Sequence, residues 1–259
     1  MRSEGVSTGV IDLRTSTRLM KKILQLFVFV LLAAPAFSQD KPDKKKKKPV
    51  DMSNRPNDHF MIQFGVANWS GMPDTINKKG FSKSFNVYFL FDFPFKTNPH
   101  LSIALGPGIG SDHILFSGTH VGIKDITATI PFTNVSDTDH FKKTKLATVY
   151  LEAPIEFRYS GDPLKGNGLK LAIGLKVGTL LNAHTRNTKF ENKSGGALGD
   201  FTMKETSKKF FNKSRISVTG RVGWGHISLF ANYQLTALFK DGAGPVVKPY
   251  SVGLTLSGL

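Results

Sequence analysis

The side chains of this sequence that could do chemistry are charged groups at alternate positions of otherwise apolar stretches. Within residues 146–160, the odd positions from 147 to 159 are apolar or aromatic, whereas the even positions include Glu152, Glu156 and Arg158. A period of two assigns the two sets to opposite faces of a β-strand. Carboxylates beside a guanidinium could relay protons, or they could neutralise one another as a buried ion-pair network. Nothing in the spacing favours a transport path, so we expect the structural network.

The same alternation in the other apolar stretches puts further charged side chains on the polar face. They are Asp92, Lys170, Lys176, Arg215 and Arg221, which complete the predicted network. Residues 146–160 and 168–183 are expected to form a hairpin. In it Glu152 pairs with Lys176 and Glu156 with Lys170. Whichever register holds, one pair lies directly opposite and the other on the diagonal, and both remain in reach.

One short motif suggests catalysis, His226-Ile227-Ser228. It resembles the His-x-Ser of outer-membrane lipid A deacylases. A nucleophile, a base and an orienting acid must all lie within reach of one another, and no glutamate is evident near this motif. We therefore favour a turn histidine. The other histidines lack metal-ligand spacing, and the chain has no cysteine, so we expect neither enzyme activity nor a cofactor.

Eight stretches of alternating hydrophobicity predict eight strands. They cover residues 60–69, 83–93, 101–115, 146–160, 168–183, 215–223, 226–239 and 248–257. For the sixth and seventh strands, pairing Val222 with Ile227 satisfies both faces and makes Trp224-Gly225 the turn, where glycine can adopt positive φ. The remaining connections, among them residues 116–143 and 186–213, read as polar loops.

The connections alternate in length: those after odd-numbered strands are long and polar, and those after even-numbered strands are short. Outer-membrane barrels have this pattern, with short periplasmic turns and long outside loops. A soluble sandwich, the competing fold, has no reason to sort its loops in this way. The fold class we predict is all-β, an eight-stranded antiparallel transmembrane up-and-down β-barrel.

The interior of such a barrel is expected to be filled rather than open. Eight strands enclose a space just wide enough for side chains, which argues against a diffusive pore. Gly106, Gly108 and Gly110 lie on the polar face of their strand and would leave room for bulky neighbours. A glycine-rich phosphate loop is not expected, because the glycines are spaced by two and no Lys-Ser/Thr follows.

The segment Tyr150-Leu151-Glu152-Ala153-Pro154-Ile155-Glu156-Phe157-Arg158-Tyr159 resembles the central strand of the porin-like outer-membrane β-barrel family common in Bacteroidota. Residues 168–181 are similar to the strand that follows it there, and Phe64-Gly65-Val66 to the first strand. The resemblance covers residues 60–259 and implies an outer-membrane barrel with no assigned substrate. Family members usually end on an aromatic residue that the assembly machinery reads, whereas this chain ends on Leu259.

The N-terminal region predicts secretion. Residues 20–38 run from basic through apolar to small side chains, the order of a signal peptide, with cleavage expected after Ser38. The apolar run is too short for a membrane anchor. Residues 1–19 read as a non-native upstream extension. Residues 39–57 form a flexible periplasmic linker in which Lys44 to Lys48 either remain solvated or contact an anionic cell-wall polymer or lipid. Residues 58–259 form the barrel domain.

The chain carries a net charge of +16, and lysines crowd the expected outer loops. Phosphate groups of lipopolysaccharide would lie at that height and attract them. The alternative is a solvated rim without a partner. The expected contacts are Lys142, Lys143, Lys145, Lys208, Lys209 and Lys213. Outer-membrane lipid, lipopolysaccharide and the assembly machinery are therefore the expected partners of a monomer in the outer membrane, with no role for nucleic acid.

These observations favour a non-enzymatic outer-membrane barrel with a structural or adhesive role, or one that binds through its loops. Two alternatives come from other classes. One is a lipid A-modifying enzyme in the same barrel. The other is a soluble lipocalin-like carrier, which would need a roomy apolar interior rather than charged inward faces.

The alternation of loop lengths predicts the orientation of the barrel. A protease-site tag inserted near Ser194 should be cut in intact cells, because that connection is expected outside, whereas a tag within residues 160–167 should be protected. Cleavage is read by immunoblot before and after the outer membrane is permeabilised. Equal protection of both tags in intact cells would contradict the orientation.

Overall fold

The computed structural model describes residues 59–74, 76, 78 and 80–258. The predicted signal peptide (20–38), the linker (39–57) with its lysine run, the upstream extension (1–19) and Leu259 lie outside the described residues. Within the described ranges, no helix has the length and apolar character needed to cross a bilayer.

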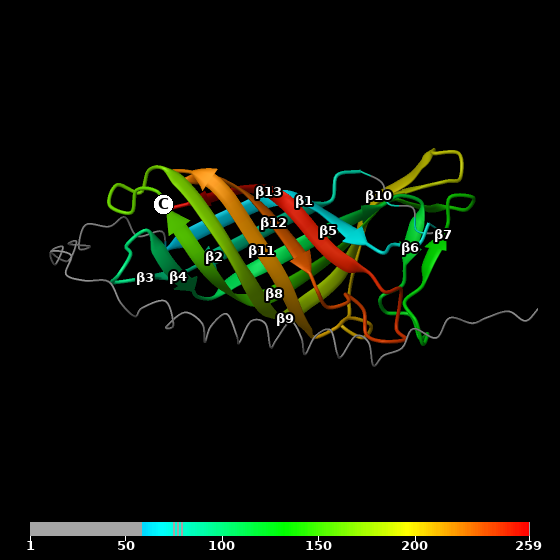
Figure 1. Ribbon diagram of the computed structural model, residues 1–259. Coiled ribbons are helices and arrows are strands. Elements are labelled where there is room, and N and C mark those ends of the chain that lie inside the picture. Colours follow the sequence, from blue (N-terminus) through cyan, green and yellow to red (C-terminus); the bar gives the residue numbers. More distant parts are fainter. Residues whose placement is uncertain (1–58, 75, 77, 79, 259) are drawn as a thin grey trace, which may run out of the picture. The chain divides into compact units, whose positions relative to one another are not determined.

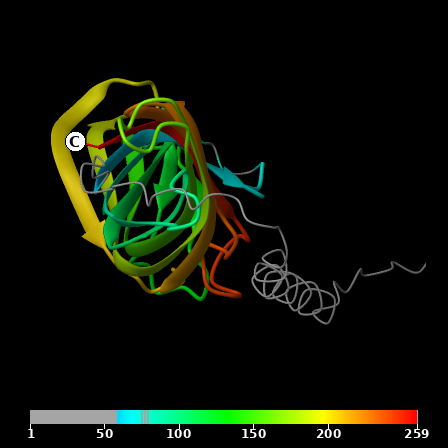
Figure 2. The same cartoon turned by 60° about the vertical axis from the view of Figure 1, so that its left-hand side comes forward.

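Antiparallel strands close into a ring, as the views in Figures 1 and 2 show. In ring order the strands are β1 (Phe60–Ser70), β2 (Lys83–Phe89), β5 (Gly108–Phe116), β8 (His140–Ser160), β9 (Leu169–Glu191), β11 (Ser214–Trp224), β12 (Ile227–Gln234) and β13 (Lys248–Ser257). β13 pairs back onto β1, which closes the barrel. The predicted eight-stranded antiparallel barrel is confirmed.

Two predicted strands are each interrupted once. The second is split into β2 and β3 (Phe91–Pro94), and the third into β4 (Leu101–Leu105) and β5, so that β3 pairs with β4 and β4 pairs with β8. The second break falls at Gly106-Pro107, where proline has no N–H to donate to the ladder. The Pro107 carbonyl instead accepts from the Phe89 N–H at 2.9 Å. The wall of the barrel therefore bends here without opening.

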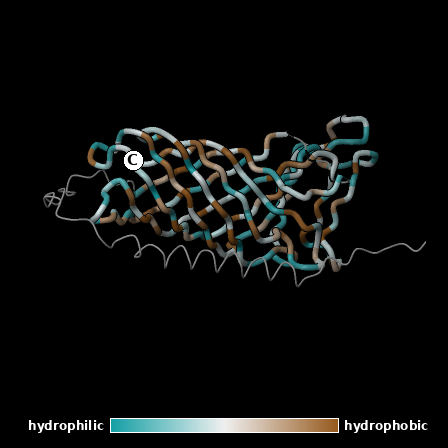
Figure 3. Tube along the Cα trace, viewed as in Figure 1, coloured by the Kyte–Doolittle hydropathy of each residue, from teal (hydrophilic) through white to brown (hydrophobic). Residues whose placement is uncertain are grey.

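The strands bear apolar side chains outside and polar ones inside, the reverse of a soluble protein. Figure 3 shows the hydrophobic residues along the strands of the barrel wall. The exposed apolar belt includes Phe64, Phe85, Ile109, Leu151, Ile155, Ile173, Val177, Val222, Leu229, Val252 and Leu254. A continuous exposed surface of this kind is stable only against an apolar surrounding such as lipid.

The two ends of the barrel differ, as the sequence predicts. Residues 95–100, 161–168 and 225–226 connect strands at one end, here called the short-turn end. Residues 71–82, 117–139, 192–213 and 235–247 connect them at the other, the long-connection end. Figure 1 shows β3 and β4 towards the first and β6, β7 and β10 towards the second. β1 begins and β13 ends at the short-turn end, where the Gly258 N–H donates to the Phe60 carbonyl at 3.3 Å.

The predicted register between the sixth and seventh strands is wrong by two residues. Ile227 lies opposite Trp224, and Val222 lies opposite Leu229, so the turn is Gly225-His226. Gly225 has φ of +56°, as a glycine in a tight hairpin turn can. A shift by two preserves which face each side chain occupies, so the hydrophobic pattern fits both registers equally well.

Two connections predicted as loops contain strands. Residues 116–143 include β6 (Thr119–Val121), β7 (Phe132–Asn134) and the start of β8, and residues 186–213 include the end of β9 and all of β10 (Ala197–Thr206). β8 has 21 residues and β9 has 23. A membrane-spanning strand needs only about 9–11 residues. The long-connection halves of β8 and β9, with β10 paired to β9, therefore extend beyond the apolar belt.

A β-bulge in β9 separates its two halves. Val149 of β8 lies opposite Asn182 and Tyr150 lies opposite Leu180, so Leu181 is an extra residue. Before the bulge the buried positions of β9 are even-numbered, and after it they are odd-numbered, as Asn187 illustrates. An extra residue re-aims every side chain that follows it. The even-numbered residues beyond the bulge, Arg186 among them, therefore face outward.

Candidate functional site: a filled lumen and a capped end

The eight charged residues predicted for the lumen come from four strands. Asp92 lies on β3, Glu152, Glu156 and Arg158 on β8, Lys170 and Lys176 on β9, and Arg215 and Arg221 on β11. Glu152, Glu156, Lys176, Arg158 and Arg215 are buried. The contacts among these residues form two clusters, one near the middle of the barrel and one near the short-turn end.

The first cluster is centred on Glu152. Its Oε1 accepts from Nε of Arg215 at 2.5 Å, and a second guanidinium nitrogen of Arg215 also contacts it. Its Oε2 accepts from the Tyr88 hydroxyl at 2.5 Å, which in turn accepts from Nζ of Lys176 at 3.0 Å. Arg215 also donates to Oδ2 of Asp112 at 2.9 Å and stacks on the Tyr150 ring. Two acids thus meet two cations inside one hydrogen-bonded unit.

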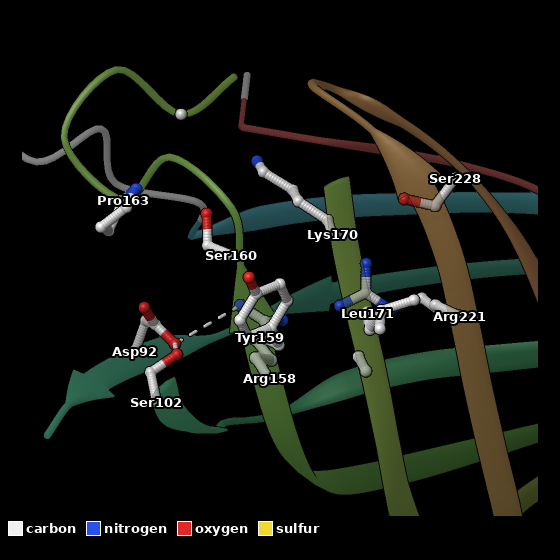
Figure 4. Close-up of a pocket in the computed structure, with 12 residues that line it drawn as sticks. Asp92, Ser102, Arg158, Tyr159, Ser160, Pro163, Lys170, Leu171, Arg221 and Ser228 are labelled. Carbon is white, nitrogen blue, oxygen red and sulfur yellow. Dashed lines mark hydrogen bonds and ion pairs between the residues drawn. The ribbon is translucent and has the colours of Figure 1, made fainter. Parts of the chain in front are cut away.

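The second cluster is centred on Glu156. Its Oε2 accepts from Nε of Arg158 at 2.9 Å and from Arg221 at 2.6 Å. Arg158 lies 3.8 Å from Oδ1 of Asp92, which accepts a 2.7 Å bond from the hydroxyl of Ser102. Figure 4 shows this end of the lumen, with Asp92 and Arg158 joined by a dashed line. Here too, two carboxylates face two guanidinium groups, which offsets part of the cost of burying the charges.

The predicted pairing within the β8–β9 hairpin differs from the structure. Glu152 lies opposite Gly178 and Glu156 opposite Gly174. Glu152 therefore pairs with Arg215, on a strand that is not its neighbour, and Lys176 reaches it through Tyr88. The alternation correctly predicts the inward face, whereas contacts across the lumen depend on how the ring closes.

Three residues of the first cluster were missing from the predicted network. Tyr88 and Tyr150 are uncharged, so a search for charged groups passes over them. Asp112 follows Gly110 by two positions, so the alternation continued one step further would have put its side chain inside.

Inward-facing glycines make room for these side chains, as expected from their spacing. A Cβ on Gly110 would lie 2.8 Å from Oε2 of Glu152 and 2.9 Å from Arg215, and one on Gly108 would lie 2.1 Å from the Tyr88 ring. These approaches are closer than atoms tolerate, so only glycine fits at both positions.

Little space remains inside the barrel. The cavity at the short-turn end measures about 40 Å³ and is bordered by Asp92, Ser102, Arg158, Lys170, Arg221 and Ser228, among others (Figure 4). A second cavity of about 10 Å³ lies beside Asp112, Lys176 and Arg215. Volumes of this size hold a few water molecules at most. Neither of these two cavities, both bordered by described residues, is an aqueous path of the width that larger barrels enclose.

An apolar cluster closes the long-connection end. Trp69 lies 5.7 Å from Phe116 and 5.9 Å from Phe239, and Phe211 lies 5.2 Å from Phe239, measured between ring centroids. Residues from several connections complete the cluster, among them Ile123, Ile130, Phe210, Leu238 and Val247. Asn212 joins two connections by donating to the carbonyls of Ala237 and Phe239, each at 2.8 Å. The connections are thus packed into an ordered cap.

The six lysines predicted to contact lipopolysaccharide lie on two different parts of the fold. Lys142, Lys143 and Lys145 are on β8, and Lys208, Lys209 and Lys213 lie between β10 and β11. Lys142 lies 3.2 Å from Glu191. Lys209 donates to the carbonyls of Asp125 and Thr127, so it holds the cap together.

The motif His226-Ile227-Ser228 has no catalytic geometry in this structure. His226 lies in the β11–β12 turn, and its Nδ1 lies 2.9 Å from the Ser257 carbonyl. Ser228 points into the lumen beside the cavity of Figure 4. Within the described residues, no hydrogen bond joins the side chains of His226 and Ser228. Within the same range, no three His, Asp or Glu side chains gather as metal ligands would.

A closed antiparallel barrel with an exposed apolar belt, a charged filled lumen and long connections at one end defines a membrane β-barrel of the outer-membrane type. The family described as "Outer membrane protein beta-barrel domain" matches residues 37–240. The chain belongs to this family, and its location is the outer membrane.

Two solved structures resemble the chain, both of Ail, the attachment invasion locus protein of Yersinia pestis. One, a complex with the heparin analogue sucrose octasulfate, has 11% sequence identity and a TM-score of 0.35, and the other has 10% and 0.34. Each alignment covers 76% of this chain and 94% of Ail. At TM-scores this low, the likeness supports no functional argument. No curated protein sequence matches the chain.

The two alternative partners of Glu152 can be distinguished by double-mutant cycles. Glu152→Ala should destabilise the barrel by about 3–5 kcal/mol, because it leaves a buried guanidinium with one partner fewer. The coupling free energy of Glu152 with Arg215 should exceed its coupling with Lys176 by about 1 kcal/mol or more, since of these two cations only Arg215 touches the carboxylate. Each cycle combines alanine variants and is measured by urea unfolding in liposomes. A larger coupling with Lys176 would favour the register expected from the sequence.

Proposed function

We propose that this protein is a non-enzymatic, monomeric outer-membrane barrel that acts by binding at its long-connection end, in a structural or adhesive role at the cell surface. The observation that carries the proposal is the closed interior. Ion pairs fill the lumen, and a packed apolar cluster caps it. A barrel with a filled and capped lumen is not suited to conduct solutes. Its connections are already packed into one arrangement, so binding a ligand there does not require the free energy of ordering them.

Alternative functions have less support. A soluble carrier needs an apolar cavity and a polar exterior, and the exposed belt with its charged lumen is the opposite arrangement. A lipid A-modifying enzyme needs an acid, a base and a nucleophile in contact, and His226 bonds to a backbone carbonyl instead.

Several finer expectations belong to the same proposal. They are kinship with the porin-like family of Bacteroidota, secretion by a signal peptide cleaved after Ser38, insertion by the assembly machinery, and cell-wall contact through Lys44 to Lys48. The long-connection end faces the outside, because both chain ends of the barrel domain and the short turns lie together at the other end.

Lipopolysaccharide is the proposed partner of the outer rim. Several lysines of the long-connection end are exposed, among them Lys143, Lys208 and Lys213. Each cation at the height of the lipid phosphates contributes about 1 kcal/mol to the free energy of binding, and salt screens this attraction.

The closed interior predicts that the protein does not conduct ions. Purified barrel reconstituted into planar bilayers should add no steady current beyond that of the protein-free bilayer, because side chains occupy the lumen. Replacing Glu152, Lys176 and Arg215 together by glycine removes part of the filling and should introduce a measurable leak. Steady current through the unaltered protein would contradict the proposal.

The rim predicts salt-sensitive binding of lipopolysaccharide. Affinity for purified lipopolysaccharide in detergent micelles should fall as salt rises from low to physiological concentration, because exposed charges are screened. Changing Lys142, Lys143 and Lys145 together to glutamine should weaken binding. If the affinity changes neither with salt nor with the triple substitution, the lysines of the rim are solvated and do not bind lipopolysaccharide.

A further inference from the structure

Three cations lie side by side on the outer wall, where β8, β9 and β10 extend beyond the apolar belt. Lys145 of β8 lies opposite Arg186 of β9, and Arg186 lies opposite Lys204 of β10. We call these three residues the cationic row. Neighbouring strands lie about 4.8 Å apart, so the row concentrates three positive charges within roughly 10 Å.

The bulge at Leu181 creates the row. Without the extra residue, Arg186 would continue the even-numbered series of Lys176 and point inward. Beyond the bulge, Thr185 and Asn187 are buried and Arg186 is exposed on the same face as Lys145. Because of the bulge, the Arg186 side chain faces outward at the level of Lys145 and Lys204.

Nothing within the described part of the chain neutralises the row, since none of its three side chains forms an ion pair there. Like charges directly opposite each other on adjacent strands destabilise a sheet. Burial and then the charges of Arg186 and Lys204 lower the pKa of Lys145, which lies beyond the membrane-spanning part of β8. An anion seated on the row would relieve this repulsion.

The surface below the row leads directly into the apolar belt. One step towards the short-turn end, the buried Ala147 lies opposite the partly buried His184, and beyond them come Val149, Leu151 and Leu181, of which the two leucines are exposed. Burial first, and then the charges of Lys204 and Lys145, lower the pKa of His184, so this histidine adds no positive charge at neutral pH. Acyl chains at the belt would therefore lie next to the row without an intervening charged layer.

The surface above the row is aromatic. Four residues further along their strands, Phe141 and Phe190 lie opposite each other. Their ring centroids lie 5.2 Å apart, and that of Phe201 lies 5.5 Å from Phe141 and 5.8 Å from Phe190. Phe201 is 52% exposed. This Phe cluster offers flat apolar faces roughly 13 Å from the row.

We propose that the outer wall of β8, β9 and β10 is a binding site for the phosphorylated glycolipid of the outer leaflet, with its phosphate on the cationic row. Its acyl chains lie along the apolar belt, and its sugar rings pack against the Phe cluster. The order of the three zones matches the order of the three parts of such a lipid. The inference rests on the proposed orientation and rim function, and it assigns the contact to one place.

The other anions that could meet the row match fewer zones. Free phosphate would use the row alone, and an anionic phospholipid would use the row and the belt but not the Phe cluster. The two are therefore controls for the proposed ligand.

The test compares two triple variants that remove the same charge. Lys145→Gln, Arg186→Gln and Lys204→Gln abolish the row. Lys124→Gln, Lys193→Gln and Lys240→Gln remove three lysines exposed on connections elsewhere on the rim. Affinity is measured at low salt in detergent micelles for lipopolysaccharide, its enzymatically dephosphorylated form and phosphatidylglycerol, with inorganic phosphate as a competitor. Circular dichroism and urea unfolding check that each variant folds.

The row variant should bind lipopolysaccharide about a hundredfold more weakly than the unaltered protein, as expected for three charges near an anionic surface. The control variant should change less than threefold. Dephosphorylated lipopolysaccharide and phosphatidylglycerol should bind the unaltered protein more weakly than intact lipopolysaccharide, and millimolar phosphate should not compete. Phe201→Ala should weaken binding of lipopolysaccharide several-fold and leave that of phosphatidylglycerol unchanged.

Different failures point to different conclusions. Equal losses in the two triple variants would overturn the site while the salt-sensitive rim of the proposed function stands. If the affinity of the unaltered protein for lipopolysaccharide does not change with salt, both the proposed rim function and the proposed site would be overturned. Equal affinity for the dephosphorylated form, or for phosphatidylglycerol, would overturn recognition of a phosphorylated glycolipid. If Phe201→Ala weakens the binding of lipopolysaccharide and phosphatidylglycerol equally, the role of the Phe cluster in binding sugar would be overturned.

Discussion

The contact on which this barrel depends is the buried pair of Glu152 and Arg215. A carboxylate in a narrow lumen loses most of its water, and only a cation with well-placed donors offsets that loss. Arg215 supplies the donors from across the lumen, and Tyr88 supplies another. Other features of the interior follow, since Gly108 and Gly110 are needed to make room, and Asp112 and Lys176 balance the charge.

The cap adds a second constraint at the long-connection end. Apolar groups such as Trp69 and Phe239 are buried by residues from several connections, so these connections cannot move independently without exposing the cluster. The filled lumen and the cap together favour recognition at the surface of the barrel over transport through it. Transport needs mobile contents, whereas recognition gains from a surface whose shape is set before the ligand arrives.

Much of the fold was predictable because strands enforce a period of two. Alternation assigned Glu152, Glu156 and Arg158 to the interior, and the structure has them there. Register was less predictable, since a shift of two residues leaves each face unchanged, and the turn at Gly225 was misplaced for that reason. The partner of Glu152 was missed because Arg215 is on a strand that is not adjacent in the sheet. The bulge at Leu181 and the strand β10 were also missed, because neither leaves a distinct mark in the pattern.

The bulge also bears on how sequences of this fold can diverge. Its effect depends on the count of residues in β9 and not on which residue is extra. Loss of a single codon near position 181 would exchange the inward and outward sets of the long-connection half of the strand, and a compensating insertion would restore them. In an alignment of relatives, a one-residue gap here would therefore mark a change in what the outer wall presents, even where every charged residue is retained.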